Sequence, residues 1–426
     1  MKENKTKPDI RFKGFTEAWE QRKFVRVFDG LQNNTLSRAD LNYEGGTVKN
    51  VHYGDVLIKF GDYIDASKTE LPYISDSTKA DKFKSSFLQD GDIIIADTAE
   101  DDTVGKCTEI QGSEGLKLLS GLHTVACRPK EKYGQMFLGY YINSPAYHNQ
   151  LKPLMQGIKV TSISKSALQD TDMIMPKSID EQIRIGEYFS TLDNLITLHQ
   201  RECDQLKELK KSMLKKMFPR DESSIPEVRF AGFTDAWEQR KLGEVVEFYN
   251  GDRSSRYPTD SDIVPDGIPF INAGDLVSGR VKLDTANKIT KEKYNELSGA
   301  KIQRGDIIYC LRGTLGKNAF IDNFDSGTVA SSLVDIRPKK IVGKYLFQVL
   351  NSDIEYRQRT INDEGAAQPN LSAKNLSLFD IPMSNKDEQT KIAEYFSNLD
   401  NLITLHQREL EILKNLKKTC LKRMFI

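Results

Sequence analysis

The sequence predicts an α+β protein in which two strand-rich α/β regions are joined by two long antiparallel coiled-coil helices, with pseudo-two-fold symmetry between two half-molecules. Two internal repeats predict the duplication. The segment RFKGFTEAWEQRK (Arg11 to Lys23) recurs as RFAGFTDAWEQRK (Arg229 to Lys241), and the segment from Glu181 to Phe218 recurs from Glu388 to Phe425. Between the repeats the sequence diverges, and β-branched runs that follow Gly-Asp turns favour short strands.

The repeats divide the chain into segments. Their period of roughly 210 residues is too long for a solenoid and indicates two copies of a half-molecule. We expect a first globular region with its N-terminal entry segment at 1–178, a first helical region at 179–218, a polar linker at 219–227, a second globular region at 228–386 and a second helical region at 387–426.

The repeated helical regions carry a coiled-coil pattern. Ser190 before Asp193, and Ser397 before Asp400, form S-x-x-D capping signatures, which predict that each long helix begins there. About 27 residues then give a rod of about 40 Å, which matches about 12 base pairs of DNA. The expected seam has a 3-4 spacing and comprises Leu192, Ile196, His199, Cys203, Leu206, Met213 and Met217, with Leu399, Ile403, His406, Leu410, Leu413, Cys420 and Met424 in the second copy.

Polar residues also fall in this seam. Lys210 and Lys417 interrupt it and are expected to snorkel at its edge. His199 and His406 are interpreted as core histidines rather than as ligands or catalysts. The alternative to a coiled coil is that both helices are core helices of one large domain.

Composition excludes several classes of protein. No apolar run is long enough to span a bilayer, and the N-terminus lacks the apolar core of a secretory signal, so we expect a cytoplasmic protein without a membrane segment. The five cysteines are scattered without a CxxC pair, so neither a disulfide framework nor a metal site is expected. The formal net charge is zero, which leaves local basic patches possible.

Motifs for catalysis are missing from the sequence. There is no phosphate-binding G-x-x-x-x-G-K-[ST] loop, no G-x-G-x-x-G cofactor loop and no Asn-Pro-Pro-Tyr-like motif of an adenine methyltransferase. We therefore expect a chain that is not an enzyme and binds no cofactor itself.

The whole layout resembles the specificity subunits of type I restriction–modification systems. The resemblance rests on the repeated GFTxAWEQRK segments, the repeated E-Q-x3-E-Y-F-S-x-L-D-N-L-I and the K-x-M-F helix ends. Within the globular regions, IPFINAGDL, GDIIYCLRGTLGK, GAAQPNLSAKNL and GIKVTSISKSAL are also similar to that family. The resemblance to this family covers essentially the whole chain.

The resemblance implies that the globular regions are target-recognition domains, each of which recognises one half of a split, asymmetric site in double-stranded DNA. It implies that the helices set the spacer and dock two modification (methyltransferase) subunits, joined by two restriction (motor-nuclease) subunits. S-adenosylmethionine, ATP and magnesium would then be bound by those partners.

Candidate DNA-binding residues follow from the chemistry of base and phosphate contacts. Arginine recognises guanine and asparagine or glutamine recognises adenine in the major groove, while Lys, Ser and Thr hold phosphates. In the second region the candidates are Arg253, Arg256, Asn272, Arg312, Thr314, Lys317, Gln368 and Asn370. In the first region they are Arg38, Lys49, Asn50, His52, Lys106, Lys159 and Thr161.

Two other functions remain open on the sequence. A duplicated coiled-coil adaptor would bind proteins or glycans through its globular ends and would lack salt-sensitive affinity for DNA. A specificity module that works with a methyltransferase alone, without restriction, would have the same sequence features.

Overall fold

The structure is a computed structural model that describes residues 6–220, 223–363 and 369–426. The chain forms two compact units: Met1–Gln200 with Arg408–Ile426, and Arg201–Gln407. Each unit therefore holds one globular region and a part of each long helix, α6 (Ile179–Lys216) and α12 (Lys386–Arg423). Among the described residues, no helix combines the length and the apolar character that crossing a bilayer requires.

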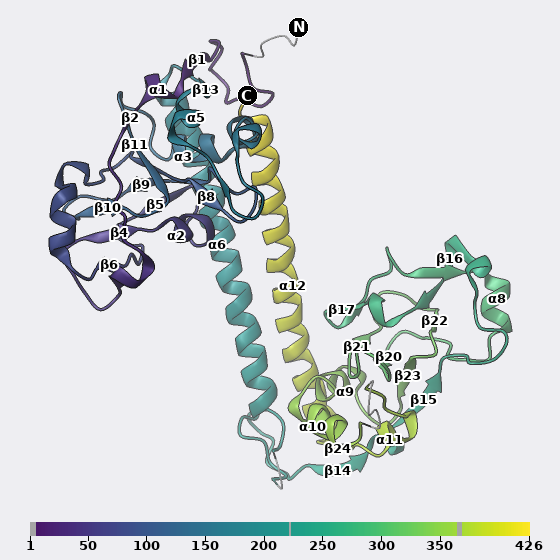
Figure 1. Cartoon of the computed structure of the whole chain (residues 1–426). Helices are drawn as coiled ribbons and strands as arrows, with labels where there is room; N and C mark the ends of the chain where they lie inside the picture. Colours follow the sequence, from purple (N-terminus) through teal and green to yellow (C-terminus); the bar gives the residue numbers. More distant parts are fainter. Residues whose placement is uncertain (1–5, 221–222, 364–368) are drawn as a thin grey trace. The chain divides into compact units, whose positions relative to one another are not determined.

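The first unit is built on a five-stranded sheet (Figure 1), antiparallel except where β5 pairs with β9. Its strand order is β2 (Phe28–Gly30), β11 (Thr124–Pro129), β7 (Ile93–Ala96), β9 (Cys107–Gln111) and β5 (Tyr63–Asp65). A second sheet has the order β10 (Leu118–Ser120), β4 (Lys49–Val51), β6 (Tyr73–Ile74) and β3 (Leu41–Asn42). The two-stranded pairs are β1 (Glu20–Lys23) with β13 (Asp172–Met175), and β12 (Thr161–Ser162) with β8 (Thr98–Ala99).

Short helices complete the first unit. They are α1 (Phe24–Val27), α2 (Tyr53–Ile58), α3 (Phe137–Asn143), α4 (Pro145–His148) and α5 (Lys165–Gln169), with 3-10 turns at Arg38–Asp40, Ser77–Ser86 and Lys152–Leu154.

The second unit repeats this plan with a four-stranded antiparallel sheet. Its order is β15 (Val246–Asn250), β23 (Leu333–Pro338), β20 (Ile307–Cys310) and β21 (Asn318–Phe320). The smaller sheets are β19 (Asn287–Ile289), β16 (Ile263–Ile271) and β22 (Thr328–Val329); β14 (Glu238–Lys241) with β24 (Asp380–Met383); and β17 (Leu276–Val277) with β18 (Arg280–Val281). The short helices are α7 (Leu242–Val245), α8 (Lys291–Glu296), α9 (Gly343–Val349), α10 (Asp353–Ile361) and α11 (Ala373–Ser377), with 3-10 turns at Asp260–Asp262 and Ala273–Asp275.

The Gly-Asp motifs mark the central strand of each main sheet. Successive side chains of a strand point to opposite faces, and Ile93 and Ile95 pack in the core shared with the long helices while Ile94 packs in the core beneath the second sheet. Ile307 and Ile308 divide in the same way. The continuous β-branched run is therefore the signature of a strand that is buried on both faces.

The aspartates of these motifs have a structural role. Asp92 accepts two hydrogen bonds from the guanidinium of Arg128, at 2.9 and 2.7 Å, and Asp306 accepts the same pair from Arg337, at 3.0 and 2.8 Å. These buried ion pairs join the start of the central strand to the end of its neighbour, so the aspartate and the arginine recur at equivalent positions of the two halves for a structural reason.

The long helices begin earlier than the capping signatures predicted. Each has 38 residues, about 57 Å at 1.5 Å per residue, so the expected length of about 27 residues was wrong. The caps are Ser178, whose hydroxyl accepts from the N–H of Glu181 at 3.3 Å, and Asn385, whose side chain accepts from the N–H of Glu388 at 2.9 Å. Ser190 and Ser397 lie inside the helices.

Within each unit the two helix segments run antiparallel. In the first unit His199 Nδ1 lies 3.2 Å from Glu409, and in the second unit His406 Nδ1 lies 3.2 Å from Glu202. Each seam residue named above is buried or half-buried, whereas Leu195, Leu198, Leu402 and Leu405 on the outer faces are exposed.

The lysines of the seam do not snorkel, contrary to expectation. Lys417 forms ion pairs with Asp193 at 2.6 Å and with Asp62 at 2.8 Å, and Lys210 forms one with Asp400 at 2.6 Å. Asp193 and Asp400 come from the facing helix, so the ammonium groups point into each pair rather than out of it.

The repeated entry segments fasten each globular region to a long helix. Arg11 donates two hydrogen bonds to Glu181, at 2.6 and 2.8 Å, and the indole of Trp19 donates to the same carboxylate at 3.3 Å. In the second unit Arg229 and Trp237 bind Glu388 in the same way, at 2.6, 2.9 and 3.0 Å.

The K-x-M-F helix ends contribute an aromatic ring to each unit. Phe425 stacks on Phe189 at 5.7 Å between centroids, and Phe218 stacks on Phe396 at 6.2 Å. We call the Arg–Glu–Trp triads and these rings the repeated contacts. They give the repeated segments the same structural role in both units.

Candidate DNA-recognition surface

In the second unit, several loops meet at one edge of the main sheet. Strands β15 and β20 end at this edge and β23 begins there, because Asn250 pairs with Val334 and Cys310 pairs with Leu333. The N–H of Leu371 donates to the carbonyl of Leu311 at 2.9 Å, which brings a later loop to the same edge. The second-unit loop edge is thus formed by residues 251–256, 311–317, 330–332 and 369–371.

Most of the second region's predicted residues lie at this edge. Arg312 and Thr314 are exposed, and Arg312 Nε donates to Asn370 Oδ1 at 3.1 Å. Arg253 is exposed and donates to the carbonyl of Ser331 at 3.1 Å, and Arg256 is also exposed. The edge therefore presents guanidinium, hydroxyl and amide groups together, as direct recognition of base edges requires. Gln368 lies outside the described residues.

Asn272 and Lys317 serve the loops themselves. Asn272 is half-buried and begins a 3-10 turn, where its backbone N–H donates to Asp275 at 2.8 Å. Lys317 is half-buried, and its ammonium group donates to the carbonyl of Ala273 at 2.9 Å. These contacts tie two loops together, so both residues support the surface in this structure.

The first unit has an equivalent edge. Strands β2 and β7 end there and β11 begins, because Cys127 pairs with Gly30 and Thr124 pairs with Ala96. The N–H of Ile163 donates to the carbonyl of Asp97 at 2.9 Å, as Leu371 does to Leu311. The first-unit loop edge is formed by residues 31–34, 97–106, 121–123 and 156–163.

Three predicted residues belong to this first edge. Lys159 is exposed, and Thr161 is half-buried in β12. Lys106 is half-buried and donates to the carbonyl of Leu57 at 2.8 Å. Burial lowers the pKa of Lys106, which disfavours its charged form. Lys159 and Thr161 are thus the better candidates for contact with DNA.

Asn50 and His52, which the sequence also proposed for DNA binding, lie below the surface in this structure. The side chain of Asn50 is fully buried, and His52 is 6 % exposed. His52 caps α2 by accepting from the N–H of Gly54 at 3.1 Å, and its pKa is lowered by burial and by the nearby charge of Arg38. The N–H of Gly121 donates to the carbonyl of Val51 at 2.9 Å, so residues 121–123 run next to the segment that contains Asn50 and His52.

Arg38 and Lys49 also make contacts within the fold. Arg38 forms a bidentate ion pair with the buried Asp55, at 2.8 and 2.9 Å. The ammonium group of Lys49 lies 5.5 Å from the centre of the Tyr73 ring. Arg38 remains half-exposed while it holds Asp55, so its first role in this structure is to neutralise a buried carboxylate.

His123 is a residue at the first edge that the sequence did not single out. It is partly exposed, has a left-handed φ of 55° and lies with its Nδ1 3.6 Å from Asp97. Its ring packs edge-on against Tyr53 at 5.3 Å. The sequence around His123 contains no recognisable motif. The histidine comes close to Asp97 only through the pairing of β7 with β11.

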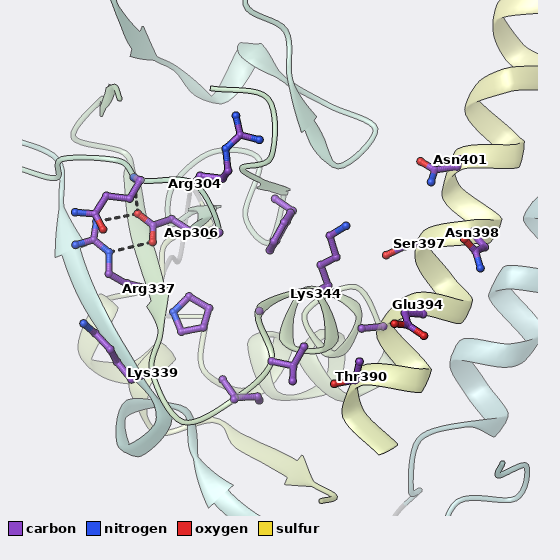
Figure 2. A pocket seen from close by; sticks show the side chains of 18 residues that line it. Arg304, Asp306, Arg337, Lys339, Lys344, Thr390, Glu394, Ser397, Asn398 and Asn401 are labelled. Atoms are coloured by element: carbon purple, nitrogen blue, oxygen red, sulfur yellow. Dashed lines mark hydrogen bonds and ion pairs between the residues drawn. The ribbon is translucent and has the colours of Figure 1, made fainter. Parts of the chain in front are cut away.

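A separate cavity of about 910 Å³ lies at the opposite edge of the second unit's sheet. Figure 2 shows it between the strand ends that carry Asp306 and Arg337 and the α12 residues Glu394 and Ser397. The nearby Arg304 pairs with Asp325 at 2.7 Å, and Arg337 pairs with Asp306. The cavity contains none of the predicted DNA-binding residues.

Comparison with known proteins gives consistent matches. The chain is 24% identical over 278 residues to the type I restriction enzyme MjaVIII specificity subunit of Methanocaldococcus jannaschii. The aligned part is 63% of this chain and 64%, just under two thirds, of that relative. It is 23% identical over 424 residues to the putative type I restriction enzyme MjaX specificity subunit of the same organism, over 94% of this chain and 91% of the relative.

The fold matches a solved structure as well. The crystal structure of a type I restriction-modification system S subunit from M. genitalium is 15% identical, has a TM-score of 0.63 and covers 99% of both chains. The family model described as the type I restriction modification DNA specificity domain matches residues 18–208 and 234–415, which is most of the chain. The protein therefore belongs to this family of DNA-recognition subunits, which are not themselves catalytic.

Proposed function

We propose that the chain recognises a split, asymmetric site in double-stranded DNA, with one half-site for each globular region. The observation that carries this proposal is that the two units share the repeated contacts but differ in the side chains at equivalent loop edges. Where the second edge carries Arg312 beside Asn370, the first edge carries Thr98 beside Ser162, in the same strand pairing. Different side chains on one scaffold are what recognition of two different half-sites requires.

The chemistry at each edge supports base recognition. Arginine pairs with the O6 and N7 atoms of guanine, and asparagine pairs with the N6 and N7 atoms of adenine. Arg312 and Asn370 are hydrogen-bonded to one another. This bond orients the guanidinium and the side-chain amide in the protein without DNA. Arg253, Arg256 and Lys159 are exposed cations and are proposed to hold phosphates.

The outer faces of the long helices support docking of two copies of a partner. Leu195 and Leu198 are 37 and 49 % exposed, and their equivalents Leu402 and Leu405 are 44 and 49 % exposed. Two exposed leucines three residues apart form one apolar patch, the kind of surface that marks a contact site when it is contiguous, and two equivalent patches suit two modification subunits. On this proposal the helices also set the spacer between half-sites, and two restriction subunits join the complex.

The partners are proposed to carry the chemistry. S-adenosylmethionine, ATP and magnesium would bind to the modification and restriction subunits, and this chain would bind none of them. Its contribution is to place the methyltransferase subunits over the adenines of the two half-sites.

The proposal is tested by sequencing the methylome of a host that expresses the modification subunit of the same system, with and without the chain. The expected result is a split motif methylated on both strands, present only with the chain. A soluble assembled complex that adds no methylated motif, and whose affinity for DNA does not fall with salt, would overturn the proposal in favour of a protein-binding adaptor.

A further inference from the structure

A short hairpin projects from the first-unit loop edge. The N–H of Gln156 donates to the carbonyl of Ser162 at 2.9 Å, and the N–H of Ser162 donates back at 2.8 Å. The returning strand, β12, pairs with β8 through Ser162 and Thr98. The hairpin is therefore fixed at its base to the end of the main sheet's central strand.

The turn of this hairpin is shaped by one glycine. Gly157 has a φ of +116°, and a Cβ at this position would lie 2.0 Å from the carbonyl oxygen of Val160. Any other residue would have to move the turn, since the atom in the way is backbone. The tip thus has a defined shape, and residues 158–160 are held at its end.

The tip presents two apolar side chains to solvent. Ile158 is 102 % exposed and Val160 is 56 % exposed, with the exposed Lys159 between them. Beyond the base, Ile163 is 3 % exposed and packs in the core. Two exposed branched residues on one turn differ from a single exposed side chain, which needs no explanation.

We propose that Ile158, supported by Val160, contacts the C5-methyl group of a thymine in the major groove of the first half-site. This inference rests on the proposed function. A two-stranded ribbon fits the major groove, and the thymine methyl is the apolar group that the groove displays. Lys159, between the two apolar residues, reaches a neighbouring phosphate, so the tip combines one specific and one non-specific contact.

The loop that follows β8 in this edge also carries acidic residues. Asp102 is exposed and pairs with Lys152 at 3.1 Å, and Asp101 is exposed on the same loop. Carboxylates repel phosphates but accept hydrogen bonds from the cytosine N4 amino group in the major groove. An edge that enters the groove can place such carboxylates against base amino groups instead of against phosphates.

The test uses the full chain assembled with its modification subunit, and duplexes that carry the methylated motif. Each thymine of both half-sites is replaced in turn by uracil, which lacks only the methyl group, and the dissociation constant is measured. We expect one replacement to weaken binding about three- to fivefold, the loss that follows from burying one methyl group less.

The variant Ile158→Ala should weaken binding to the thymine duplex by a similar factor and should no longer distinguish thymine from uracil at that position. Ile58→Ala is the matched control, because Ile58 is 85 % exposed in α2 of the same unit, and it should behave as the wild type. Lys159→Ala should weaken all duplexes evenly and lower the slope of affinity against salt by about one.

Three outcomes would overturn the inference. They are a motif with no thymine in the half-site that the first unit recognises, a uracil effect that persists in Ile158→Ala, and a defect of that variant in assembly with the modification subunit rather than in DNA affinity. A wild-type complex that does not bind the motif would instead refute the proposed function, so the two failures are distinguishable.

Discussion

At the scale of single residues, Asp335 is a buried carboxyl group in the second unit, and the equivalent position of the first unit has no carboxyl group. It lies in β23 with no exposure, and one of its oxygens has no hydrogen-bond partner among the described residues. Burial and the neighbouring Asp306 raise the pKa of Asp335 to about 8. The equivalent residue of β11 is Ala126, which pairs with Ile94 as Asp335 pairs with Ile308.

We expect Asp335→Ala to stabilise the protein, and more so at high pH. Between pH 3.8 and about 8 the folded chain binds a proton at this carboxyl that the unfolded chain has released, so its contribution to stability falls as pH rises through that window. The measurement is the midpoint of thermal unfolding at pH 5 and at pH 8.5. The advantage of the variant should grow with pH, Asp335→Asn should show the same trend, and parallel pH profiles for wild type and variants would refute the assignment.

At the scale of elements, the caps of the long helices can be tested within α12. Asn385→Ala removes the acceptor of the Glu388 N–H and should cost about 1 kcal/mol of folding free energy. Ser397→Ala is the control, because Ser397 lies in the helix interior, where alanine is favoured, and it should be neutral or slightly stabilising. Urea unfolding measures both, and an equal loss in the two variants would contradict the observed helix start.

The two seam lysines give a second test at this scale. Lys417→Met leaves Asp62 and Asp193 without their shared cation and should cost about 3 kcal/mol, as breaking a buried ion pair does. Lys210→Met removes the equivalent contact, to Asp400 at a similar exposure, but leaves no second carboxylate without a cation, so it should cost less, about 1–2 kcal/mol. The ratio of the two losses in urea unfolding is the measured quantity. Equal losses would show that the Asp62 contact adds nothing.

The sequence predicted the elements better than their limits. The duplication, the strand-rich regions and the helix seam follow from repeats and periodicity, and the family comparison supports this fold class. The helix start was missed because Ser178 before Glu181 and Ser190 before Asp193 carry the same kind of signature. Only the tertiary pairing of Glu181 with Arg11 and Trp19 distinguishes them.

The candidate surface was predictable in the second unit and less so in the first. Arg312 follows a strand that begins after a Gly-Asp turn, and Asn370 follows a proline. The two side chains are hydrogen-bonded at one edge of the sheet. Asn50 looks equally polar, but β4 pairs in parallel with β10, and this non-local pairing buries its amide. Ile158 was missed because an apolar residue is ordinarily expected in the core.

At the scale of the whole molecule, the proposal of one half-site for each unit predicts separable effects on specificity. Arg312→Ala and Asn370→Ala should each relax the motif at one position of one half-site, at a cost of about 1–3 kcal/mol in binding, and should leave the other half-site unchanged. Ile158→Ala should affect the opposite half-site only. The measurement is methylome sequencing of hosts that express each variant with the modification subunit.

Arg304→Ala is the control for this experiment. Arg304 is an exposed arginine of the second unit that lies at the opposite edge of the same sheet and pairs with Asp325. Its loss removes the same charge as Arg312→Ala, so a change in overall electrostatics would appear in both variants, whereas a change in base recognition would appear only in Arg312→Ala. If Arg312→Ala altered both half-sites, or altered neither while Arg304→Ala did, the division of recognition between the two loop edges would be wrong.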